Sequence, residues 1–157
     1  MATKTAYSNG ELIVAKSGAN NAAFPSLAVF EGEFDASRIS GGMAQNDVAE
    51  VVKIPAGTLI LGVHWEVVTV EGAARYFAVG DGASTNGFIT TTSANSLASG
   101  ASALALTEGT PNTVIGFSAG KYYSAADTLD VLAVTSGGLT TCKIKLKAWG
   151  ICFGMKQ

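Results

Sequence analysis

Leu-Thr-Thr-Cys-Lys-Ile-Lys-Leu-Lys-Ala-Trp, residues 139–149, alternates apolar and polar side chains over most of its length. Successive side chains of a β-strand point to opposite faces, so this period of two predicts a strand with one face in a core and the other in water. A helix would distribute the three lysines around its circumference. We expect the inward-facing residues to be Cys142, Ile144, Leu146 and Ala148, and the outward-facing residues to be Thr141, Lys143, Lys145 and Lys147.

The same alternation recurs along the chain between short turn sequences. It predicts further strands at residues 11–16, 24–35, 47–54, 58–70, 75–79, 88–89, 113–117 and 122–134. About eight strands without a long helix indicate an all-β protein, in which two antiparallel sheets pack as a β-sandwich and jelly-roll connections are one possibility.

Three local details are part of this prediction. In residues 58–70, one face is expected to carry Leu59, Leu61, Val63, Trp65 and Val67. The turn sequence at 71–74 predicts a hairpin that joins 58–70 to 75–79. Residues 96–106 are expected to form one or two helical turns, although their glycine and serines weaken helix formation.

Composition indicates a single domain that meets a protein partner. The 157 residues are 48% hydrophobic and only 14% charged, and 19 of them are glycine. An isolated soluble domain usually carries more surface charge, so a partner is expected to cover part of this one. A net charge of −2 gives no general attraction to nucleic acid or to an anionic membrane. No apolar run reaches the roughly 18–20 residues of a membrane span, and the N-terminal sequence lacks a signal-peptide core, so synthesis in a cytosol is expected.

Nothing in the sequence predicts an enzyme, a metal site or a cofactor. His64 is the only histidine, and no nucleophile motif accompanies it. The glycine-rich run at 80–87 lacks the lysine of a phosphate-binding loop, so a structural turn is expected there. Asp127 and Asp130 lack the spaced carboxylates of a calcium loop and are expected to cap local backbone instead. Cys142 and Cys152, ten residues apart on one strand, are too distant for a disulfide and are expected to be buried free thiols.

Two sets of residues are candidates for partner binding. The stripe of Lys143, Lys145 and Lys147 is suited to an acidic protein surface or to phosphates; the alternative is an edge or outer strand that its lysines protect from aggregation. The large aromatic side chains have enough area to anchor an interface, but the alternative for each is a place in the core. These aromatic residues are Trp65, Tyr122, Tyr123 and Trp149.

The N-terminal segment is expected to be an extended arm. Residues 1–20 have too few apolar side chains to fold alone, whereas residues 21–157 contain the pattern of the sandwich domain. Such arms bind by laying their backbone along another chain's sheet edge, with a few side chains as anchors. We expect Lys4 and Tyr7 to bind a partner.

Several phrases of the sequence together resemble a known class of protein. They are Ile-Pro-Ala-Gly-Thr at 54–58, Trp-Glu-Val-Val-Thr at 65–69, Val-Gly-Asp-Gly at 79–82 followed by Asn-Gly-Phe at 86–88, Tyr-Tyr-Ser-Ala-Ala-Asp-Thr at 122–128, and the final lysine-striped strand. In this order they resemble small virion structural proteins of tailed bacteriophages, of the capsid decoration (cement) type. The resemblance covers about residues 48–148.

The resemblance implies a structural role in a virion. A cement protein needs no catalytic group; it needs a stiff sandwich, self-association and segments that lie across neighbouring subunits of the major capsid protein. The low charge of the chain and its nearly uncharged segment at 81–120 favour an oligomer, with a homotrimer expected and a homodimer as the alternative. The resemblance further implies a protein that is made in the host cytoplasm and bound to the outer capsid surface. The alternatives are another virion component such as a tail or head-fibre module, a carbohydrate-binding β-sandwich module, and a small hydrolase that uses His64.

Overall fold

The computed structural model describes residues 3–5, 25–102 and 120–153. These residues form ten strands and one turn of 3-10 helix at Ala36–Arg38, and they contain no helix long enough to cross a membrane. The first sheet, sheet A, contains β1 (Thr3–Thr5), β3 (Val48–Ile54), β9 (Asp127–Ala133), β5 (Tyr76–Gly80) and β6 (Ile89–Ser93), in this spatial order. The second, sheet B, contains β2 (Ser26–Asp35), β10 (Lys143–Cys152), β4 (Thr58–Thr69) and β7 (Ser99–Ala101), and β8 (Lys121–Tyr123) also pairs with β4.

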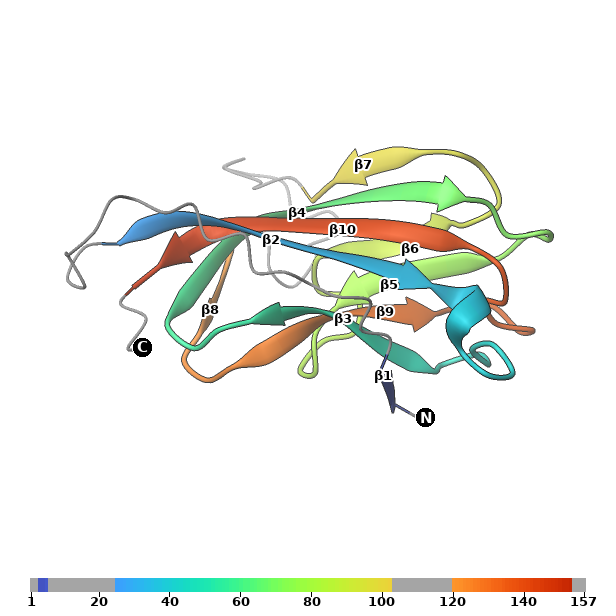
Figure 1. Ribbon diagram of the computed structural model, residues 1–157, viewed down its shortest axis with the longest axis horizontal. Helices are drawn as coiled ribbons and strands as arrows, with labels where there is room; N and C mark the ends of the chain where they lie inside the picture. The colour runs from blue at the N-terminus through green and yellow to red at the C-terminus, as the bar shows by residue number, and fades with distance from the viewer. Residues whose placement is uncertain (1–2, 6–24, 103–119, 154–157) are drawn as a thin grey trace, which may run out of the picture.

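The two sheets form the layers of a β-sandwich (Figure 1). All strand pairs are antiparallel except β1 with β3. The predicted all-β sandwich is therefore confirmed, with ten strands where about eight were expected. Early strands pair with late ones, β2 with β10 and β3 with β9, and this order agrees with jelly-roll connections.

The predicted register of the lysine-striped strand is confirmed. The four residues expected to face inward are all fully buried, while Lys145 and Lys147 are exposed. β10 lies between β2 and β4, so it is a central strand with an outward face and not an edge strand (Figure 1). Both cysteines are buried free thiols, as expected.

The predicted inward face of β4 is correct only in its second half. Val63 and Val67 are buried, but in the first half Ile60 faces the core while Leu59 and Leu61 lie on the other side. The reason is a β-bulge: Trp149 pairs with Gly62 and Gly150 pairs with Ile60, so Leu61 is an extra residue on β4. One inserted residue exchanges the two faces of a strand, which a strict alternation cannot represent.

Two further local predictions are wrong. Residues 58–70 and 75–79 do not form a hairpin, because β4 belongs to sheet B and β5 to sheet A. The chain crosses between the sheets at 70–75 instead of reversing within one. Part of the segment expected to be helical, Ser99–Ala101, is β7, which pairs with β4 at His64, Trp65 and Glu66. Pairing along a sheet edge here outweighs a weak local helix preference.

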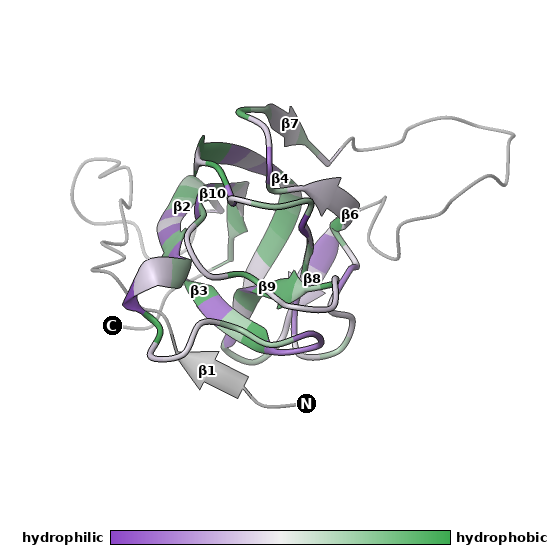
Figure 2. Ribbon diagram, turned by 90° about the vertical axis from the view of Figure 1, so that its right-hand side faces the viewer, coloured by the Kyte–Doolittle hydropathy of each residue, from purple (hydrophilic) through white to green (hydrophobic). Residues whose placement is uncertain are grey.

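The core fills the space between the sheets. Its largest fully buried side chains include Phe30, Phe34, Phe77, Phe88 and Met43. An end view shows the two sheets around this interior, with hydrophilic and hydrophobic residues alternating along β2 (Figure 2). Because both sheets contribute to one cluster, the described part of residues 21–157 has a single hydrophobic core.

A buried carboxylate joins the crossover at 70–75 to the turn before β10. The Glu71 side chain is 5% exposed and accepts backbone hydrogen bonds from Thr140, Thr141 and Cys142 at 2.8, 3.0 and 3.2 Å. The hydroxyls of Thr140 and Thr141 donate to its other oxygen at 2.6 and 3.0 Å. Burial alone would raise the pKa of Glu71, but these donors outweigh it and lower that pKa to about 2. Glu71 is therefore ionised and fully partnered, and it fixes both loops.

The described part of the predicted arm is one short strand. Residues 3–5 form β1, which adds to the edge of sheet A parallel to β3, with Lys4 opposite Ala49. Tyr7 and the strands predicted at 11–16 and 113–117 lie outside the described residues. The binding role of Lys4 and Tyr7 stays a prediction.

Candidate interaction surface

The outer face of sheet B carries a ladder of opposite charges at one end. Three acidic residues of β2 lie opposite the three lysines of β10: Glu31 opposite Lys147, Glu33 opposite Lys145, and Asp35 opposite Lys143. Lys147 Nζ lies 2.9 Å from Glu31 Oε1, and Lys143 Nζ lies 3.0 Å from Asp35 Oδ2. On the other side of β10, Lys145 is opposite Glu66 of β4.

Because of this charge ladder, the lysine stripe is not a surface of net positive charge. The predicted outward lysines are present, but carboxylates of the same sheet balance their charge. Hydrogen bonds from Ser37 and Lys143, together with the charge of Lys143, lower the pKa of Asp35 despite its burial. A stripe balanced in this way has little net field to attract a phosphate-rich partner. It is better suited to the polar rim of an interface.

The other end of the same face is apolar. The pairing of β2 with β10 places Leu27 opposite Ile151 and Val29 opposite Trp149. On β4, Leu59 lies between Ile151 of β10 and Tyr122 of β8. We call these six residues together with Phe153 the apolar end of sheet B. Its most exposed members are Leu27 at 73%, Tyr122 at 56%, Phe153 at 45%, Val29 at 42% and Trp149 at 37%. Five of the nine exposed large hydrophobic residues in the described ranges therefore gather here, next to the start of β2 and the end of β10 (Figure 1).

The aromatic candidates divide between this surface and the interior. The Trp149 ring covers Gly62, where any side chain would overlap it, since a Cβ there would lie 2.1 Å from the ring. Tyr122 and Phe153 make an edge-to-face contact with ring centroids 6.2 Å apart. Trp65, in contrast, contacts the buried Phe77, and Tyr123 is buried. Trp149 and Tyr122 thus have the exposure that an interface anchor requires.

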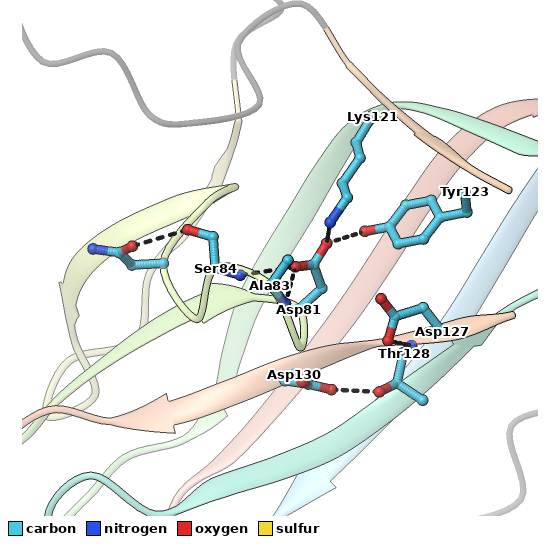
Figure 3. Close-up of polar contacts among 9 residues, drawn as sticks. Asp81, Ala83, Ser84, Lys121, Tyr123, Asp127, Thr128 and Asp130 are labelled. Atoms are coloured by element: carbon cyan, nitrogen blue, oxygen red, sulfur yellow. Dashed lines mark hydrogen bonds and ion pairs between the residues drawn. The ribbon is translucent and has the colours of Figure 1, made fainter. Parts of the chain in front are cut away.

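A polar cluster lies between the sheets, separate from this surface (Figure 3). Asp81 is fully buried after β5, and it accepts hydrogen bonds from the backbone of Ala83 and Ser84 at 2.9 and 3.0 Å. Its second oxygen accepts from the Lys121 ammonium and, at 2.6 Å, from the Tyr123 hydroxyl of β8. Burial would raise the pKa of Asp81, but these donors lower it. The glycine-rich run at 80–87 is therefore a structural turn, as predicted, and it ties sheet A to β8.

Asp127 and Asp130 have local roles, as predicted. Asp127 Oδ1 accepts from the backbone N–H of Thr128 at 2.9 Å, and Asp130 Oδ1 accepts from the Thr128 hydroxyl at 2.7 Å. In the ranges that the structure describes, no group of three or more His, Cys, Asp or Glu residues is arranged to hold a metal. Burial, followed by the charges of Glu50, Asp127 and Asp81, raises the pKa of Asp130 to about 7 against the single lowering bond from Thr128.

Asp130→Asn is expected to stabilise the protein at alkaline pH. The pKa of Asp130 is raised from 3.8 to about 7 in the fold. Its contribution is therefore fully favourable below pH 3.8 and is lost as pH rises through 7. Asn keeps an oxygen for the Thr128 hydroxyl without the charge. A rise of about three pKa units at about 1.4 kcal/mol each means that the variant should gain about 4 kcal/mol at pH 8 and little at pH 4. Urea unfolding at both pH values measures this, with Glu66→Gln, an exposed change on β4, as control. An equal effect at both pH values would contradict the raised pKa.

Solved structures of phage capsids contain chains with a similar fold. A chain in the capsid structure of Ralstonia phage GP4 matches with a TM-score of 0.62 and 10% identity, over 99% of this chain and 100% of that chain. The fold is shared with phage capsid chains. A chain of the Cyanophage Pam1 capsid asymmetric unit matches with a TM-score of 0.53 and 15% identity, over 90% and 94% of the two chains. A chain of the acidic stable capsid structure of Helicobacter pylori bacteriophage KHP30 gives 0.51 and 14%, over 82% and 93%. Neither a family model nor a curated protein sequence matches.

Sequence reasoning missed Leu27, Val29, Ile151 and Phe153 as surface residues. The signal was present at residues 27–30 and 148–153, where both parities of the strand are apolar. A strand that is apolar on both faces is typical of one that is covered on both sides. His64, the only histidine, lies opposite Lys147 and Ala101 on the partly exposed part of β4.

Proposed function

We propose that this protein is a structural component of a bacteriophage head, and that it is a decoration (cement) protein. It binds the outside of the shell across neighbouring subunits of the major capsid protein, and it associates with copies of itself. The observation that carries the proposal is the fold likeness to a chain of the Ralstonia phage GP4 capsid over 99% of this chain and 100% of that chain. The resemblance of residues 48–148 to cement proteins is an independent reason for the same role.

The physical properties of the described residues are suited to this role. Backbone pairing between early and late strands gives a stiff sandwich, and the buried carboxylates Glu71 and Asp81 fix loops at its ends. The balanced charge ladder gives a rim, in which Lys143, Lys145 and Lys147 contact the shell. The proposal requires neither catalysis nor a cofactor.

A carbohydrate-binding module is the second candidate. Clustered exposed aromatic residues would favour it, and Tyr122, Trp149 and Phe153 do lie near one another on sheet B. However, their described neighbours Leu27, Val29, Leu59 and Ile151 are aliphatic, whereas a sugar site needs convergent hydrogen-bonding groups beside its aromatic residues. This composition favours a protein partner.

The N-terminal arm is expected to strengthen attachment to the shell. A weak contact forms more readily when other contacts already hold the protein on the shell. Loss of the arm should therefore lower the affinity of the protein for the shell by roughly tenfold or more. The measurement adds full-length protein, or protein lacking residues 2–10, to shells that lack it, and counts bound copies by electron microscopy. Because the deletion also removes β1, thermal unfolding of both proteins checks that they are folded. The variant Tyr7→Ala tests the arm while leaving β1 in place.

Equal occupancy by the full-length and truncated proteins would contradict a role for the arm. No binding by the full-length protein to the shells of its own phage would contradict the decoration role itself. Binding of the full-length protein to glycans, lost in Trp149→Ala, would favour the carbohydrate-binding module instead.

A further inference from the structure

Within residues 25–102 and 120–153, no element packs on the apolar end of sheet B, whose five largest exposures range from 37% to 73%. Four observations indicate what covers it. The first is its size. Fully exposed aromatic side chains present roughly 150–250 Å² each, so the five most exposed members leave on the order of 500 Å² in contact with solvent. The largest apolar patch of a typical soluble monomer covers about 300–600 Å² and often has a binding role, and this patch lies in the upper half of that range.

The second observation is charge. The six paired members and Phe153 include no charged side chain, so the patch does not select an acidic or a basic partner. The adjoining ladder pairs Glu31, Glu33 and Asp35 with three lysines, and the whole chain has a net charge of only −2. Two copies of this protein can therefore approach with little electrostatic repulsion.

The third observation is the arrangement of the face along its strands. One end is apolar and the other carries the ladder, with the Glu31–Lys147 rung next to the Val29–Trp149 pair. Full overlap of two such faces would bring one lysine row over the other. If the two-fold axis instead runs across the strands at the apolar end, only the apolar halves of the two faces overlap, and both charge ladders stay in water. The two sheets then pack face to face, as sheets A and B do within one molecule.

The fourth observation is the area that this pairing buries. A two-fold contact covers the same patch on both copies, so the total comes to about 1,000 Å², which is the lower limit for a specific interface. An interface of this area, with Trp149 and Tyr122 as its large exposed aromatic side chains, suits a reversible dimer better than an obligate one. Each copy also gains a second attachment point when the dimer binds a shell.

We propose that the apolar end of sheet B is a self-association surface, on which two copies of this protein meet about a two-fold axis that crosses the strands. The proposal deepens the proposed function, since it names the surface through which copies meet, and it favours the homodimer, which is the alternative to the homotrimer expected from the sequence. The experiment measures association in solution without any shell. The self-association surface and the decoration role can therefore each fail while the other holds.

The experiment is sedimentation velocity of the full chain from micromolar to millimolar concentration. Leu27→Glu places a charge in the patch, and Leu97→Glu is a matched control, because both leucines are 73% exposed and Leu97 lies between β6 and β7. The original protein and the Leu97 variant should show the same monomer–dimer equilibrium. Leu27→Glu should raise the dissociation constant of the dimer by at least about tenfold, since it buries an unpaired charge.

Circular dichroism confirms that each variant is folded, and Val29→Thr provides a nearly isosteric second change that should weaken the dimer less. A monomer at every concentration, a dimer that Leu27→Glu leaves unchanged, or a trimer would each overturn the proposal. Loss of shell binding in Leu27→Glu together with a monomeric original protein would assign the patch to the capsid subunits instead.

Discussion

Leu146→Ala should lower the free energy of unfolding by about 2–5 kcal/mol, the usual cost of removing a buried leucine side chain. Leu146 is fully buried on the inner face of β10, between Gly32 of β2 and Trp65 of β4. Gly32 has no side chain that could move into the space, and it already lies against the backbone of Val51. The cavity therefore cannot close, which puts the expected cost in the upper part of the range.

Lys145→Ala is the matched control, because it changes the adjacent residue on the opposite face. Lys145 is exposed, so its loss should cost less than about 1 kcal/mol. Urea unfolding of both variants at neutral pH measures the two values. A larger loss for Lys145→Ala than for Leu146→Ala would mean that the register of β10 is wrong by one residue.

Glu71→Gln should cost about 3 kcal/mol at pH 7. The pKa of Glu71 is lowered from 4.5 to about 2 in the fold, and each unit corresponds to about 1.4 kcal/mol. Because the folded pKa is the lower one, this stability is present above pH 4.5 and is lost as pH falls toward 2. Gln keeps the shape of the side chain, but it places an amide that donates hydrogen bonds among five donors.

The measurement is the difference in unfolding free energy between Glu71→Gln and the original protein at several pH values. It should be largest at pH 7 and should shrink below pH 4.5. Glu66→Gln, an exposed change on β4, should have little effect at any pH. A difference for Glu71→Gln that does not vary with pH would show that the side chain acts by its shape and not by its charge.

The sequence allowed prediction wherever a strand alternates strictly. Residues 142–148 alternate without interruption, so their inward face followed from the period alone. β4 could not be assigned in this way, because the extra residue at Leu61 depends on where β10 pairs with it. The crossover from β4 to β5 is likewise a tertiary choice, since residues 71–74 have the composition of an ordinary reverse turn.

The candidate surface could be predicted only in part. The lysines were visible as a stripe, but their acidic partners lie on β2, far away in the sequence, and only the pairing of β2 with β10 brings them together. The apolar end depends on this pairing and on the pairing of β4 with β10 and β8, which together collect Leu27, Trp149 and Tyr122 from three strands. A sequence pattern reports the faces of single strands, whereas a surface patch is a property of neighbouring ones.

The central place of β10 has a consequence for the order in which the chain acquires its structure. During synthesis β10 emerges after every other described strand, yet it lies between β2 and β4, and its partners on β2 are more than a hundred residues earlier. Until β10 has been synthesised, the edges of β2 and β4 that pair with it remain unpaired. Sheet B therefore cannot be completed in step with translation. Contacts of such separation make folding slow. We expect the rate-limiting event of folding to be the insertion of this last strand.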